Sequence, residues 1–172
     1  MPTGKATKYA RHEHERRFLL AELPPGDAEL TVDIHDRYIV NTRLRLRRME
    51  QLQPVGPAVF KLTQKVPNSD GGAGLITNIY LTAGEYDVFA VLPAAALTKT
   101  RHHISPLAVD VFGGELAGLV LAEAEFATEA ECAAFSPPEF VVQEVTDDPR
   151  FTGGVLAVSD AATLTDLLGD LA

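Results

Sequence analysis

Several short segments of this chain have a charged residue at every second position, and the sign of the charge differs between segments. The segments are EHERR at 13–17, RLRLR at 43–47, KLTQK at 61–65, KTR at 99–101 and EAE at 123–125. In a β-strand alternate side chains lie on the same face, so each segment separates its charges from its mostly apolar neighbours. Several such strands in one small chain predict a sheet around a charged interior, which suits a polyanion and its metal ion.

The length and composition predict one compact domain over 1–172, with a helical C-terminal tail from about residue 158. The single cysteine, Cys132, excludes an internal disulfide and a cysteine-rich zinc module. The N-terminal residues are polar, and no apolar run approaches the roughly 18 residues of a membrane span. We therefore expect a cytoplasmic protein that does not associate with a membrane.

The formal net charge of −9 argues against a nonspecific nucleic-acid binder. The alternating positions of these segments nevertheless hold eight basic residues and four carboxylates, a net charge of +4, so the other residues sum to −13. This contrast predicts an acidic exterior around a basic interior. Such a distribution repels long polyanions at a distance but holds a small one that enters.

Turn signals and hydrophobic periodicity predict eight strands and few helices. The expected strands are at about 11–20, 30–40, 42–50, 58–66, 75–82, 97–105, 108–112 and 118–127, with a hairpin loop at 67–74. The expected helices are at about 83–92, at 128–134 with Thr128 as N-cap, and at 160–171 with Asp160 as N-cap. Because a closed sheet has no exposed edges, we predict a mainly β (α+β) fold: a closed eight-stranded antiparallel β-barrel with peripheral helices.

The order of these charged motifs resembles that of the CYTH superfamily, the triphosphate tunnel metalloenzymes, over roughly residues 9–157. This family includes class IV adenylate cyclases, thiamine triphosphatases and inorganic triphosphatases. The matching positions are Glu13, Glu15 and Arg17; Arg45 and Arg47; Thr63 and Lys65; Lys99 and Arg101; Asp110 and Phe112; and Glu123 and Glu125. Each motif is weak alone, but their order and spacing together are specific.

The resemblance implies a site for a triphosphate and a divalent metal ion, Mg²⁺ or Mn²⁺. The expected substrate-binding residues are Arg17, Arg43, Arg45, Arg47, Lys61, Lys65, Lys99 and Arg101. The expected metal ligands are Glu13, Glu15, Glu123, Glu125 and Asp110. The residues expected to be catalytic are Arg45, Arg47, Lys65 and Glu125. Arginine and lysine supply charge-assisted hydrogen bonds to phosphate, and Mg²⁺ prefers carboxylate oxygens, water and substrate phosphates.

The chain departs from the family pattern at three places. Arg17 replaces the usual lysine of the first motif, which keeps the charge but changes its geometry. Residues 77–80, TNIY, stand where many members have acidic residues, and Gln143 stands where a lysine often precedes EVT. These changes are compatible with the binding of a triphosphate and bear on the choice of substrate and the number of metal ions.

We therefore expect an enzyme that hydrolyses a triphosphate, inorganic or organic, and releases phosphate. The alternatives are a class IV-type adenylate cyclase that makes cyclic AMP and pyrophosphate, and a non-catalytic sensor that binds polyphosphate or nucleotide. The expected partner is a small-molecule triphosphate, and the sequence contains no signal for the oligomeric state. Two smaller expectations are that His12 and His14 face outward and that Glu144 pairs with Arg150.

Overall fold

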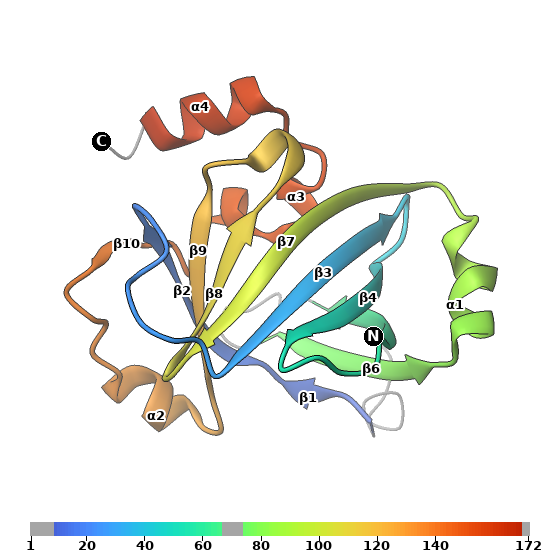
Figure 1. Cartoon of the computed structure of the whole chain (residues 1–172), viewed down its shortest axis with the longest axis horizontal. Helices are drawn as coiled ribbons and strands as arrows, with labels where there is room; N and C mark the ends of the chain where they lie inside the picture. Colours follow the sequence, from blue (N-terminus) through green and yellow to red (C-terminus); the bar gives the residue numbers. More distant parts are fainter. Residues whose placement is uncertain (1–8, 67–73, 170–172) are drawn as a thin grey trace.

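One antiparallel sheet of ten strands dominates the computed structural model, which describes residues 9–66 and 74–169 (Figure 1). The strands are β1 (Arg11–His12), β2 (His14–Leu20), β3 (Leu30–Ile39), β4 (Leu44–Gln53), β5 (Val59–Val66), β6 (Leu75–Leu81), β7 (Ala94–Ile104), β8 (Leu107–Phe112), β9 (Val120–Phe126) and β10 (Val141–Glu144). Their order across the sheet is β1-β6-β5-β4-β3-β7-β8-β9-β2-β10. The predicted hairpin loop at 67–74 lies outside the described residues, apart from Gly74.

The sheet is not closed, so the prediction of an eight-stranded barrel is wrong. The expected first strand is interrupted at Glu13 and forms two short strands that pair at opposite ends of the sheet. β1 pairs with β6 over only two residues, whereas β2 pairs with β9 along its whole length. On its other side β2 pairs with β10, from the C-terminal region, over residues 18–20. β2 does not pair with β6, and the sheet ends at β1 on one side and at β10 on the other.

The apolar faces of the alternating strands point outward, where helices cover them. Helix α1 (Ala83–Ala90) contacts β4, β5 and β6, and its Tyr86 and Phe89 pack against buried Leu46 and Leu62. Helix α2 (Glu129–Ala134) contacts β2 and β9, beside a cluster that includes buried Phe18. Burial under these helices stabilises the strands from the outside, which leaves their other face for charged residues.

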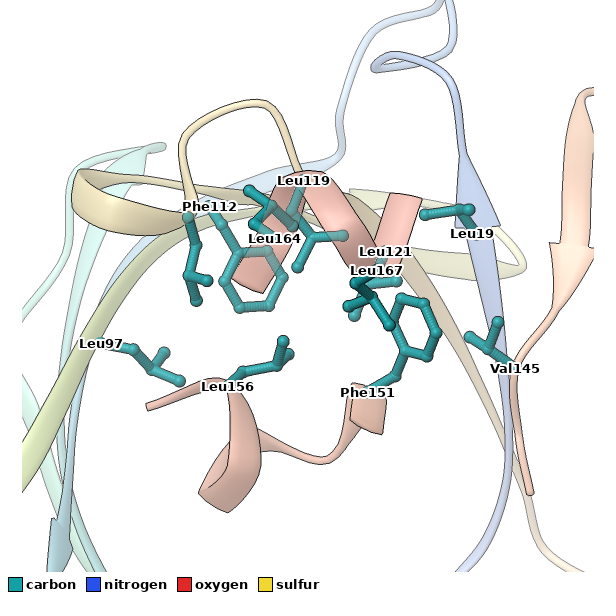
Figure 2. Packing of buried hydrophobic residues seen from close by; sticks show 11 residues of the cluster. Leu19, Leu97, Phe112, Leu119, Leu121, Val145, Phe151, Leu156, Leu164 and Leu167 are labelled. Atoms are coloured by element: carbon teal, nitrogen blue, oxygen red, sulfur yellow. The ribbon is translucent and has the colours of Figure 1, made fainter. Parts of the chain in front are cut away.

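A third apolar cluster fills one end of the space inside the sheet, beneath the C-terminal segments. The 3₁₀ helix η2 (Pro149–Phe151), helix α3 (Gly153–Leu156) and helix α4 (Ala161–Gly169) supply Phe151, Leu156, Leu164 and Leu167. Figure 2 shows these side chains packed toward residues of the sheet and of the turn after β8. The sheet and turn residues of the cluster are Leu19, Leu97, Phe112, Leu116, Leu119 and Leu121, with Val145 after β10. The short 3₁₀ helix η1 (Gly114–Leu116) lies in that turn.

The predicted helix starts agree with the structure. Thr128 forms a capping box with Glu131, and Thr82 forms a second one with Glu85 at the start of α1. Before α4, the Asp160 carboxylate accepts a hydrogen bond of 2.8 Å from the Thr163 backbone N–H. Each of these caps satisfies backbone donors that a helix leaves free in its first turn.

Among the residues that the structure describes, no helix is long and apolar enough to cross a membrane.

Candidate functional site

The inner face of the sheet surrounds a cavity of about 340 Å³ with a predominantly charged lining. Residues from β1 to β9 contribute to it, and residues of η2 and α3 line it as well. The basic side chains in the lining are Arg11, Arg17, Arg45, Arg47, Lys61, Lys65, Lys99 and Arg101. The carboxylates in the lining are Glu13, Glu15, Asp110, Glu123 and Glu125. The structure therefore brings together twelve of the thirteen residues to which the sequence analysis assigned a role.

Arg43 is the residue that the structure does not place in this lining. It precedes the first residue of β4 and is exposed, while Arg45 and Arg47 on the same strand face the cavity. Alternation along the chain predicted that Arg43 shares a face with Arg45 and Arg47, but the strand begins only at Leu44. The assignment of Arg43 to substrate binding remains a prediction without support from the cavity geometry.

We call Arg45, Arg47 and Lys61 the basic wall; they lie on adjacent strands β4 and β5. Arg47 and Lys61 are opposite each other in the register, and all three side chains line the cavity. One carboxylate, Asp36 on β3, lies behind them. Its Oδ1 and Oδ2 accept hydrogen bonds of 2.6 and 2.7 Å from Arg47 Nε and Nη2. The basic wall thus has three cations and one buried counter-ion.

Asp36 is ionised despite being only 1% exposed. Burial disfavours its charge, but the Arg47 charge and hydrogen bonds outweigh burial and lower the pKa of Asp36 to about 2. Arg45 contributes less, because its Nε is 3.7 Å from Asp36 Oδ1. The bidentate geometry fixes the plane of the Arg47 guanidinium.

Arg45 is held by a short chain of polar side chains across β5 and β6. Its Nη2 donates a hydrogen bond of 3.3 Å to Thr63 Oγ1, and this fully buried hydroxyl donates one of 2.7 Å to Asn78 Oδ1. Asn78 itself lines the cavity. The chain orients the guanidinium without neutralising it, so Arg45 keeps its positive charge for a ligand.

Lys61 makes no ion pair with any other residue in the described part of the chain. Its Nζ lies 6.0 Å from the centroid of the Tyr80 ring, the neighbour of Lys61 across β6. Burial lowers the pKa of Lys61 to about 8, and the charges of Arg47 and Arg45 add to the effect.

The opposite side of the cavity, which we call the acidic wall, contains Glu13, Glu15, Glu123 and Glu125 near β2 and β9. Three of these carboxylates are already bound to basic residues. The ion pairs join Glu13 to Lys65 at 2.8 Å, Glu15 to Arg17 at 2.7 Å, and Glu123 to Arg101 at 2.5 Å. Arg101 also donates two hydrogen bonds of 2.7 Å to buried Asp110, which contacts Lys99 as well.

The carboxylates of the acidic wall influence one another. Burial raises the pKa of Glu15, and the nearby charge of Glu123 raises it further, while Lys65 opposes the shift. The pKa of Glu123 moves the other way: burial disfavours its charge, but Arg101 and Lys99 hold the pKa well below its ordinary value. Glu125, opposite Glu15 in the register, is exposed and makes no ion pair with another described residue.

The carboxylates of the cavity can hold a divalent metal ion only if few protein ligands are needed. Within residues 9–66 and 74–169, no three His, Cys, Asp or Glu side chains converge as a preformed metal site. Mg²⁺, however, needs only one or two protein carboxylates, because water and substrate phosphates complete its coordination. Glu125, which makes no ion pair with another described residue, fits this smaller demand together with Glu15, which lies opposite it in the register. A cation there would offset the burial and the Glu123 charge that raise the pKa of Glu15.

Several residues that line the cavity or support it were not predicted from the sequence. Asp36 and Tyr38 alternate on β3 and share its inner face, so the same period-two pattern could have identified them. Burial raises the pKa of Tyr38 to about 12, with a further contribution from Asp36. His12 and His14 were expected to face outward, but both line the cavity because the strand is interrupted between them.

The far end of the cavity is apolar and involves the C-terminal tail. Leu97, Phe112 and Leu121 of the sheet line it together with Phe151 and Leu156. No local sequence signal placed these tail residues there, because the contact joins segments far apart in the chain. Glu144 and Arg150 do not form the expected link for this tail, since Glu144 pairs with Arg16 and Arg150 with Asp148.

No protein-family model matches the chain. The inorganic triphosphatase of Nitrosomonas europaea is 32% identical to it over 166 residues, which cover 86% of this chain and 97% of that protein. The crystal structure of the inorganic triphosphatase NE1496 superposes with a TM-score of 0.58 and 27% identity, covering 87% of this chain and 96% of that one. A second crystal structure of NE1496, described as a hypothetical protein, gives a TM-score of 0.57 with 27% identity over 86% of this chain and 99% of that one.

Proposed function

The chain belongs to the family of the Nitrosomonas europaea inorganic triphosphatase and is a hydrolase of the triphosphatase type, and we propose that it cleaves inorganic triphosphate inside the charged cavity. One observation supports the location most strongly: basic and acidic side chains from most strands of the sheet line a single cavity of about 340 Å³. Triphosphate has negative oxygens along its whole length, so its binding requires donors on several walls.

In this proposal the basic wall binds the phosphoryl groups. Arg45 and Arg47 donate hydrogen bonds from planar guanidinium groups whose orientations are fixed by Thr63 and Asp36. Because these donors are oriented before the substrate arrives, little reorganisation is needed as negative charge shifts during the reaction. Water attacks a terminal phosphorus, the bridging P–O bond breaks, and the leaving pyrophosphate takes its electron pair.

The acidic wall holds the metal ion in this proposal. Glu125 is the first candidate ligand, because it makes no ion pair with another described residue, whereas Glu13, Glu15, Glu123 and Asp110 become available only if their basic partners move toward the substrate. When bound, Mg²⁺ or Mn²⁺ supplies charge neutralisation for phosphate oxygens and lowers the pKa of water. Arg17 and Lys65 pair with carboxylates of the acidic wall in the free protein, and they donate hydrogen bonds to triphosphate oxygens instead when the substrate binds.

A direct assay tests the proposal and its alternatives. The purified chain is incubated with tripolyphosphate, thiamine triphosphate and ATP, each with Mg²⁺ or Mn²⁺, and phosphate, pyrophosphate and cyclic AMP are measured. We expect phosphate and pyrophosphate from tripolyphosphate, with no activity after chelation of the metal. Cyclic AMP from ATP supports a cyclase instead, and tight binding of tripolyphosphate without any product supports a sensor.

A further inference from the structure

The three lysines of the cavity have different electrostatic surroundings. Lys65 is bound to Glu13 through two contacts of 2.9 and 2.8 Å, and Lys99 contacts the buried carboxylate of Asp110. Lys61 has no carboxylate within ion-pair distance in the described part of the chain. Its ammonium group is therefore the one of the three that no carboxylate binds directly, so its charge responds to an anion that enters the cavity.

The groups that face Lys61 come from several strands, and most of them are positive. Arg45 and Arg47 face it from β4 and Arg101 from β7, and all three disfavour its charge. Asp36 on β3 favours the charge, but its two oxygens are already bound to Arg47. The Tyr80 ring on β6 offers only a weak cation–π contact. In the absence of a ligand, the surroundings of Lys61 thus disfavour its charge, so it loses its proton at a lower pH than an ordinary lysine.

We propose that Lys61 takes up a proton when a polyphosphate binds to the basic wall, so that substrate binding and protonation of this side chain are coupled. The inference rests on the proposed function, because it assumes that the phosphoryl groups bind beside Arg45 and Arg47. An anion at that position reverses the local field, since it adds negative charge where three arginines now disfavour the ammonium form. Above about pH 8, where Lys61 of the free protein is mostly neutral, binding then turns it into a third cationic donor to the substrate.

The direction of the pH dependence follows from linkage. Burial and the neighbouring arginines lower the pKa of free Lys61 to about 8, and a bound anion raises it. Proton uptake is therefore absent at pH 6.5, where Lys61 is already charged in both states, and largest between the two pKa values. At pH 9 we expect the uptake of up to about one proton per bound ligand, from the change between mostly neutral and mostly charged forms.

Isothermal titration calorimetry measures this uptake directly. Imidotriphosphate, a triphosphate whose bridging oxygens are replaced by NH groups, is titrated with Mg²⁺ into the protein at pH 6.5 and pH 9. At each pH two buffers of different ionisation enthalpy are used, and the difference in apparent enthalpy gives the number of protons exchanged. Protons that the ligand itself exchanges contribute equally in all variants and cancel in the comparison.

The variants separate the charge of Lys61 from its ability to titrate. Lys61→Arg keeps the charge at pH 9, so we expect binding as tight as in the wild type or tighter, without the uptake assigned to Lys61. Lys61→Met loses both the uptake and a donor, so we expect weaker binding at pH 6.5. Arg48→Lys is the control outside the cavity, because Arg48 is half-exposed and pairs with Glu50, so its replacement leaves the uptake at pH 9 as in the wild type.

The outcomes distinguish this inference from the proposed function. Equal proton uptake in the wild type and Lys61→Arg, with ligand bound in both, overturns the coupling and leaves the triphosphate site intact. Failure of the folded wild type to bind imidotriphosphate contradicts the proposed site and, with it, the coupling. Thermal unfolding of each variant confirms that the comparison is made between folded proteins.

Discussion

The basic wall and the acidic wall of the cavity differ in how their charges are compensated. On the basic wall, three cations share the single carboxylate of Asp36, and Lys61 has no acidic partner among the described residues. On the acidic wall, three of the four glutamates are bound to lysine or arginine, and only Glu125 makes no such pair with a described residue. One wall therefore has unused positive charge, while the other has carboxylates that depend on their cations. This asymmetry suits a substrate that binds as an anion together with a metal cation.

Breaking the buried pair of the basic wall gives the largest expected effect. Arg47→Ala leaves the Asp36 carboxylate buried without its main partner, and we expect unfolding free energy to fall by about 3–5 kcal/mol. Urea unfolding measures the change. Arg48→Ala is the matched control on the same strand, because Arg48 pairs with Glu50 and is much more exposed. A loss below about 1 kcal/mol for Arg47→Ala is incompatible with Asp36 as a buried, ionised counter-ion.

Removal of a donor without disturbing the buried pair tests binding and catalysis on the same wall. We expect Arg45→Ala to lower kcat/KM for tripolyphosphate by roughly a hundredfold or more, because one oriented cationic donor is lost. Steady-state phosphate release measures the change, with Arg48→Ala again as the control. Near-wild-type hydrolysis by Arg45→Ala would place the phosphates elsewhere in the cavity.

The acidic wall is expected to respond differently, because its role is to hold the metal. Glu125→Gln should reduce turnover by about a hundredfold at low Mg²⁺, and a higher Mg²⁺ concentration should restore part of the activity. Activity measured over a series of Mg²⁺ concentrations shows the shift. Glu22→Gln, in an exposed loop, controls for the loss of one negative charge. A reduction that no Mg²⁺ concentration relieves contradicts a ligand role for Glu125.

The smallest expected effect concerns the stability of the acidic wall. Because the pKa of Glu15 is raised in the folded protein, its ionised carboxylate opposes folding. This penalty appears as the pH rises above 4.5, the ordinary pKa of a glutamate. Glu15→Gln should therefore slightly raise the unfolding midpoint at pH 7 without metal, and the gain should disappear at pH 4. Thermal unfolding at both pH values is the measurement. A loss of stability at pH 7 would mean that the ion pair with Arg17 dominates.

The local structure was largely predictable because it depends on short-range patterns. Alternating charges located most of the strands, and the Thr128 and Asp160 caps marked two helix starts. Closure of the sheet was not predictable in the same way, since it depends on which strand lies beside β2. The short segment 141–144 gave little signal for its place in the sheet, yet as β10 it occupies that position.

The site was predictable wherever the odd or even position of a residue along a strand decides which face of the sheet its side chain occupies. Odd or even position along the chain predicts the inward-facing side chains correctly within β4, β5, β7 and β9. It fails at Arg43, which precedes the first residue of β4, and at His12 and His14, which flank the break between β1 and β2. The expectation of a triphosphatase-type hydrolase is confirmed by the Nitrosomonas europaea relative, and the wider superfamily name is not supplied by the comparisons. The individual roles of the residues remain predictions.

The outward packing of Leu46 and Leu62 under α1 constrains how this chain can change its length. Insertion of one residue near the start of β4 would turn Leu46 into the charged interior and Arg47 toward the helix, so folding and substrate binding would fail together. Insertion of two residues would restore both faces at the cost of a shifted register. Related chains should therefore tolerate changes of length in these strands only in pairs of residues, while their loops vary freely.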